Sequence, residues 1–159
     1  MDVFEWAARL EASPLGEWMR SSALAYPVAN VLHLLGLVLL VGPILLLDLR
    51  LLGIARELAL APLSRLSTHA AVCGLTLLAT TGVLMFAADA GPLLKNGIMQ
   101  AKLCFIVLAV ANALSFRALW DKKLATWDSH PPALGRLQAY FSIVAWLCVG
   151  ALGRWIAYS

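Results

Sequence analysis

The sequence predicts an all-α integral membrane protein, a four-helix bundle preceded by an amphipathic helix at the membrane surface. Of its 159 residues, 62% are hydrophobic and only 13% are charged, whereas soluble domains average about 25% charged residues. Four stretches are apolar over the roughly 20 residues that a helix needs to cross a bilayer. The composition and the four stretches together indicate that the chain lies in a lipid bilayer.

The N-terminal segment 1–22 is too polar to span a membrane. Its apolar residues recur at helical spacing with charged residues between them, which predicts an amphipathic helix. Ser13 and Pro14 then resemble the cap and first turn of a second short helix. We expect this segment to lie in the membrane interface and residues 23–159 to form the transmembrane domain.

Four spans follow, at about 23–47, 66–88, 98–119 and 137–158. The first begins near Tyr26-Pro27 and contains Gly42-Pro43. In the second, Ala70, Gly74 and Thr81 recur near one face, and small residues let membrane helices approach closely. The fourth ends in Arg154, Trp155 and Tyr158, a basic and aromatic anchor typical of the headgroup level.

Charge predicts the orientation and excludes one class of partner. The net charge is +3, from 12 basic and 9 acidic residues, and the basic residues lie beside apolar spans rather than in a patch with aromatic residues. This excludes nucleic acid as an expected partner. More of them fall in the first and third loops than at the termini and the second loop, which predicts that both termini are periplasmic.

His33 lies inside the first span, where an ionisable residue is a functional candidate by default. At about 1.5 Å per residue, it lies about 25 Å from the level of Arg50, whereas His69 lies only about 6 Å from that of Arg65. The two histidines therefore make a poor axial pair for one haem. His130, beside two prolines, is expected at the surface, and Cys73, Cys104 and Cys148 have no metal-ligand spacing.

The residues that lie at about the same membrane depth as His33 suggest a haem b site. Asn30 and Gly36 lie one turn to either side of it on the same face, and Gly82 of the second span lies at the same depth. His33 would be an axial ligand, with Met85, a second protomer's His33 or nothing opposite it. Three cations near the outer surface would receive the propionates: Arg20, Lys102 and Arg154.

Two other roles for His33 remain open. It would only fix helix packing if it hydrogen-bonds Asn112, Thr81 or a carbonyl of another span. A proton pathway has little support, because no acidic residue lies between Asp48 and Asp89. The leading expectation is electron transfer or an accessory role in a membrane redox complex, and the alternative is a cofactor-free structural subunit or small transporter. We expect a homo-oligomer or a subunit of a larger complex.

Asp48 and Arg50 end the first span. Residues two apart on a helix do not face each other, so we expect different partners: Arg65 for Asp48 and a lipid phosphate for Arg50, closing the first loop. No nucleophile, base and orienting group converge in the sequence, so an enzyme is not expected.

Several motifs resemble a family of small four-helix bacterial inner-membrane proteins of unknown function. They are Arg20-Ser21, Tyr26-Pro27, His33-Leu34-Leu35-Gly36, Gly42, Asp48 to Gly53, Thr81-Gly82, Phe86, Asn96, Lys102 and Asn112. The resemblance implies the fold and a bacterial inner membrane but no activity. His33 on a Leu/Gly-rich first span is also distantly similar to that of small membrane cytochromes b and copper-resistance membrane proteins.

Overall fold

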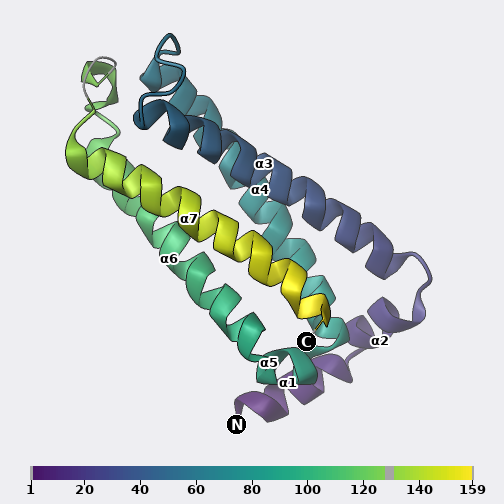
Figure 1. Cartoon of the computed structure of the whole chain (residues 1–159). Coiled ribbons are helices and arrows are strands. Elements are labelled where there is room, and N and C mark those ends of the chain that lie inside the picture. The colour runs from purple at the N-terminus through teal and green to yellow at the C-terminus, as the bar shows by residue number, and fades with distance from the viewer. Residues whose placement is uncertain (1, 128–130, 159) are drawn as a thin grey trace.

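The computed structural model describes residues 2–127 and 131–158, and in these ranges every regular element is a helix. Four helices are long and apolar enough to cross a membrane: α3 (Ala25–Leu51), α4 (Leu60–Ala88), α6 (Gly97–Trp120) and α7 (Ala133–Trp155). They form two antiparallel hairpins, α3–α4 and α6–α7 (Figure 1). The predicted fold class, a helical membrane bundle, is confirmed.

Helices α3 and α4 extend further than the sequence predicts toward the loop that connects them, at the end of the bundle that also holds the α6–α7 loop. α3 continues through Pro43 to Leu51, so Asp48 and Arg50 belong to the helix rather than to the loop. α4 begins at Leu60, because Pro62 lies in its first turn, where proline is tolerated. Polar residues are therefore carried on the helices of this end of the bundle.

The α3–α4 interface is formed by direct backbone contact at two glycines. A Cβ atom added to Gly74 would lie 2.6 Å from the backbone nitrogen of Leu40 and 2.7 Å from the carbonyl oxygen of Gly36. Only glycine fits at this distance, and close approach of this kind drives helix association in membranes. The predicted packing role of Gly74 is confirmed.

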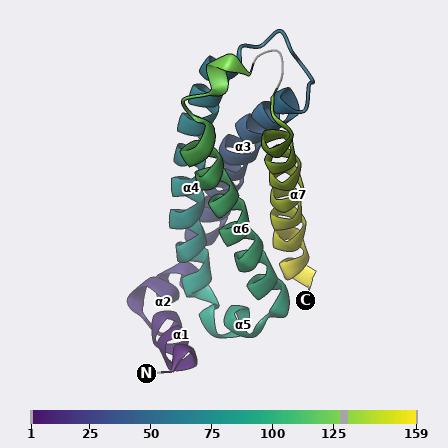
Figure 2. The ribbon, with the colours of Figure 1, turned by 90° about the vertical axis from the view of Figure 1, so that its left-hand side faces the viewer.

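α7 completes the bundle by packing against both α3 and α6, whereas α4 and α6 scarcely contact each other. Figure 2 shows the four helices from the side, with α7 beside α6. A central cluster holds the bundle together and is made of Leu40, Ala109, Ala145, Trp146 and Val149. The α4–α6 side is therefore the least closed face of the bundle.

Three short helices form a collar at the other end, α1 (Val3–Glu11), α2 (Pro14–Ser21) and α5 (Ala90–Lys95), seen at the bottom of Figure 1. Arg20 donates hydrogen bonds to the carbonyls of Ala88 and Glu11, both at 2.8 Å. The Glu11 side chain accepts from Gly91 N at 2.9 Å. Helices α1 and α2 are thus fixed to the end of α4 and to α5. The exposed side of the collar carries Phe4, Trp6 and Trp18. Two 3₁₀ turns complete the chain, Leu124–Thr126 and Ile156–Tyr158.

Candidate functional site

His33 connects α3 to α4 through one hydrogen bond. Its Nδ1 lies 2.8 Å from the Thr81 hydroxyl oxygen, which is itself 2.7 Å from the carbonyl oxygen of Leu77. A carbonyl only accepts, so the single hydroxyl proton of Thr81 goes to Leu77. The hydroxyl then accepts from His33, which assigns the ring proton to Nδ1 and leaves a lone pair on Nε2.

Gly82 makes room for this imidazole. A Cβ atom at Gly82 would lie 3.4 Å from Cε1 of His33, so the ring lies against the glycine of the neighbouring span. Gly82 lies at the depth that the sequence predicts. Of the three expected packing partners of His33, namely Asn112, Thr81 or a carbonyl of another span, Thr81 is the one observed. Asn112 instead donates to the carbonyl of Gln138 at 3.1 Å.

The other residues expected beside a haem lie in different surroundings. Gly36 lies within the α3–α4 interface, where an added Cβ would meet the carbonyl of Gly74 at 3.1 Å and the side chain of Leu78 at 3.0 Å. Asn30 is exposed. Met85 packs with Met19 against the collar end of the bundle. Gly36 therefore serves helix approach, and the space beside it is filled by α4.

The three expected propionate ligands are also separated. Arg20 is bound to two carbonyls of the collar, and Arg154 hydrogen-bonds Tyr158 and lies over its ring. The Lys102 side chain lies along Gly153, where an added Cβ would be 3.3 Å from Nζ. Lys102 is thus the cation of this set that belongs to the interior of the bundle.

His69 does not lie near His33. His69 is exposed, and its Nδ1 lies 2.7 Å from the Arg65 carbonyl of its own helix, as expected from its depth. His130 lies outside the described residues. Within residues 2–127 and 131–158, no three His, Cys, Asp or Glu side chains gather in a way that would hold a metal ion.

A second polar site lies toward the opposite end, in a cavity of about 170 Å³ lined by all four spans. We call it the Asp48 cavity. Besides apolar residues, it is lined by polar groups of every span: Asp48, Ser67, Thr68, Asn112, Arg117, Gln138 and Ser142. A volume near 10–15 Å³ is enough for one water molecule, so this cavity has room for a molecule larger than water.

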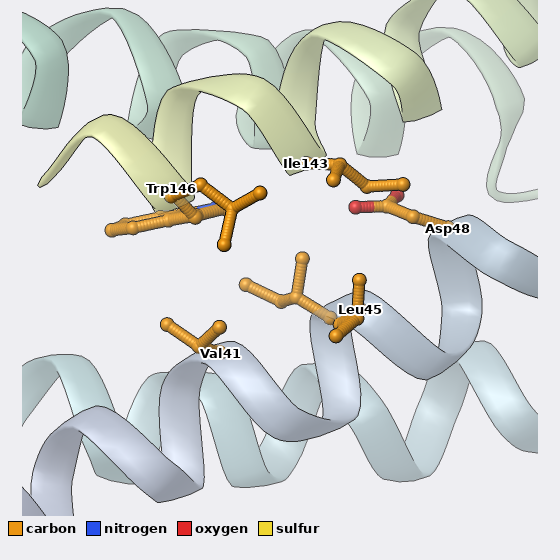
Figure 3. A pocket seen from close by; sticks show the side chains of 7 residues that line it. Val41, Leu45, Asp48, Ile143 and Trp146 are labelled. Atoms are coloured by element: carbon orange, nitrogen blue, oxygen red, sulfur yellow. The ribbon is translucent and has the colours of Figure 1, made fainter. Parts of the chain in front are cut away.

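Two polar atoms of the cavity lining have no partner. Asp48 is 6% exposed, and its carboxyl group hydrogen-bonds Ser142, but Oδ2 has no hydrogen-bond partner. Trp146 is 5% exposed, and its Nε1 has none either. Figure 3 shows a smaller pocket of about 20 Å³ between α3 and α7 that both side chains also line, with Asp48 beside Ile143 and Trp146 further along α7. Buried polar groups are nearly always paired in native proteins, so two unpaired atoms in one cavity indicate a site for a bound molecule.

Arg117 lines the same cavity, but its charge is already balanced. It donates to the hydroxyl oxygens of Ser64 and Thr68 at 3.1 and 2.9 Å, and it forms an ion pair with Asp121 at 3.2 Å. These bonds connect α6 to α4 on the side where the two helices scarcely pack. Arg117 therefore closes one end of the cavity and fixes its width.

Gln138 is the centre of a third polar group, a hydrogen-bond network in which its side chain is paired on both sides. Its side chain accepts from Trp120 Nε1 at 2.7 Å and donates to the Ser115 hydroxyl at 3.1 Å. The network joins α6 to α7 beside the cavity. Its pairing contrasts with the unpaired atoms of Asp48 and Trp146.

The expected partners of the Asp48–Arg50 segment are wrong, although the two residues do have different partners. Asp48 bonds Ser142 rather than Arg65. Arg50 is only 1% exposed and donates from Nε to the Leu58 carbonyl at 2.6 Å, so it does not face lipid phosphate. Arg50 holds the turn after α3, where Gly53 adopts a positive φ of 101° that favours glycine.

Sequence reasoning missed the cavity, although α7 carried a pattern that indicates it. Gln138, Ser142 and Trp146 are spaced by four residues and share one face of a helix. A polar stripe on a transmembrane helix faces the interior of the bundle. The stripe on α7, taken together with Asp48 at the end of the first span, could have identified the site.

Comparison with known proteins gives one match. Residues 3–159 match the sequence model of the Family of unknown function (DUF6644). No curated protein and no solved structure matches the chain. The likeness to small membrane cytochromes b has no support among these comparisons.

Proposed function

The chain belongs to this family of unknown function, and because the family brings no activity, we propose from the site alone that the protein binds and transports a small polar solute in the Asp48 cavity. This is the cofactor-free alternative of the sequence analysis. In it, His33 is a packing residue that holds α3 against α4 through Thr81.

The observation that carries the proposal is the pair of unpaired atoms, Asp48 Oδ2 and Trp146 Nε1, in one cavity. An unsatisfied polar atom costs several kcal/mol in hydrocarbon, where no solvent replaces the lost partner. Both side chains line the Asp48 cavity, whose volume of about 170 Å³ exceeds that of a single water molecule, as well as the smaller pocket of about 20 Å³. A bound solute would satisfy both atoms at once.

Cysteine accessibility tests whether solutes reach the cavity. In a background with the three native cysteines replaced by alanine, we expect Ser142→Cys to react with a small charged thiol reagent added to intact vesicles. Ala145→Cys is the matched control, because Ala145 lies on the same helix, is 1% exposed and belongs to the packed core. Equal inertness of the two variants would contradict the proposal.

A second candidate is haem b ligation by His33, and one observation favours it. Donation from Nδ1 to Thr81 leaves Nε2 as the basic atom, and a metal-bound histidine characteristically donates its other ring N–H to an acceptor. Met85, a second protomer's His33 or no residue would then be the sixth ligand. Lys102 is the propionate partner that the bundle interior offers.

Absorbance distinguishes the two candidates. Protein purified from haem-replete cells would show a Soret band that shifts on reduction with dithionite if haem is bound. His33→Ala would abolish the band and His69→Ala would leave it. A flat spectrum would remove the haem candidate and leave the solute site untouched.

We also propose a bacterial inner-membrane location with both termini in the periplasm, supported by the greater number of basic residues in the first and third loops. A reporter that is active only in the periplasm, fused after the last residue, should be active. Assembly as a homo-oligomer or with other subunits remains a prediction, and native mass spectrometry measures it.

A further inference from the structure

We propose that the Asp48 cavity takes a small amphiphilic amine that carries an oxygen acceptor, and that this ligand enters from the bilayer between α4 and α6. The inference rests on the proposed solute-binding function and specifies its ligand. It follows from the charge of the lining, the two unpaired atoms, the size of the cavity and the position of its opening.

Charge selects a cation. The cavity is lined by two ionisable side chains, Asp48 and Arg117. Arg117 has its counter-ion in Asp121 at 3.2 Å, whereas the contact of Asp48 is the neutral hydroxyl of Ser142. A buried carboxylate without a counter-ion is expensive, so a protonated amine supplies what the lining lacks. Its N–H group would donate to Oδ2.

Trp146 adds a second requirement. The indole Nε1 is a donor and never an acceptor, so an ammonium group cannot satisfy it. A hydroxyl or ether oxygen on the same ligand would accept this bond. The aromatic ring of Trp146 would also favour a nearby cation through its electron-rich face. Asp48 Oδ2 would thus be satisfied by a cationic donor on the ligand, and Trp146 Nε1 by an oxygen acceptor on the same ligand.

Size and access define the rest of the ligand. An engineered apolar cavity of about 150 Å³ holds benzene, so about 170 Å³ suits a ligand with a short hydrocarbon part. Leu40, Ile44 and Val110 provide apolar walls for it. Two lining residues, Val72 of α4 and Leu114 of α6, are 58% and 65% exposed on the outer surface of the bundle, which lipid would cover. The opening therefore faces lipid tails, which admit amphiphiles rather than strongly hydrated ions.

The test is calorimetric titration of the purified full chain in detergent with four probes of similar size. Two are amino alcohols, 2-amino-1-butanol and 4-amino-1-butanol. Butylamine lacks the oxygen, and 1,2-butanediol replaces the amine of the first probe by a neutral hydroxyl. We expect at least one amino alcohol to bind more tightly than butylamine and the diol.

Two variants assign the contacts. Asp48→Asn should weaken binding of the amino alcohol about tenfold or more, the usual result of removing one partner of a buried charge pair. Trp146→Phe should reduce its affinity to that of butylamine and leave butylamine binding unchanged. Asp89→Asn is the matched control, because Asp89 is an exposed carboxylate at the opposite end of α4, and it should bind like the original chain.

The outcomes separate the ligand class from the underlying function. The cavity binds solutes but the amine assignment is wrong if the diol binds as tightly as the amino alcohols and Asp48→Asn leaves the affinity for the amino alcohols unchanged. If no probe binds and Ser142→Cys is also unreactive, the solute-binding function itself is wrong. Amine binding that survives Asp48→Asn would place the ligand elsewhere and overturn the inference.

Discussion

The α3–α4 interface and the Asp48 cavity both contain polar side chains within the membrane, yet they are built on opposite rules. In the interface, glycine backbones touch, and the one polar side-chain pair, His33 with Thr81, is complete. In the cavity, four spans leave space, and Asp48 and Trp146 each keep an unpaired atom. A polar residue in a membrane therefore indicates function more strongly when its partner is missing than when it is merely present.

The largest expected effect comes from breaking the interface. Gly74→Ala places a Cβ within 2.6 Å of a backbone nitrogen of α3, and overpacking of this kind costs about 1–3 kcal/mol. Unfolding in mixed detergent, followed by circular dichroism, measures it. Gly150→Ala is the control, because nothing lies within 4 Å of its added Cβ, and it should be neutral or stabilising by up to about 1 kcal/mol. Equal stability of the two variants would refute the backbone contact.

A change in the cavity should have the opposite sign. Asp48→Leu removes a buried carboxyl group with an unpaired oxygen, so the ligand-free chain should gain about 1–2 kcal/mol of stability in the same assay. The gain would accompany loss of solute binding, the exchange expected at functional sites. A loss of stability of similar size would show that Asp48 is a structural residue like His33.

The His33–Thr81 pair should have a smaller and measurable coupling. Interhelical hydrogen bonds in membranes average about 0.6 kcal/mol and reach about 1.7 kcal/mol. A double-mutant cycle of His33→Leu and Thr81→Val should give a coupling in this range, since the two side chains bond each other directly at 2.8 Å. Additive effects of the two substitutions would contradict the assigned bond.

Hydrophobic length was sufficient to identify the four spans, although α3 and α4 extend beyond the predicted bounds. The depth count placed Gly82 beside His33 correctly. Sequence reasoning failed where the partner depends on helix rotation. Gly36 and Asn30 share a face with His33, yet Gly36 packs against Gly74 while Asn30 is exposed. Asp48 is expected at the boundary that ends the first span, paired with Arg65, whereas α3 continues to Leu51 and Asp48 bonds Ser142 in the interior of the bundle.

The smallest expected effect on stability concerns a single indole N–H group, which is paired in the hydrogen-bond network of Gln138 and unpaired in the Asp48 cavity. Trp146→Phe and Trp120→Phe remove the same atoms from two tryptophans, but the Trp120 Nε1 donates to Gln138 at 2.7 Å and the Trp146 Nε1 has no partner. The Trp120 variant should lose about 1 kcal/mol more stability than the Trp146 variant, the net value of a typical hydrogen bond. Adding the amino alcohol should then reverse part of the contrast, because the original chain gains stability from a ligand that Trp146→Phe binds less tightly.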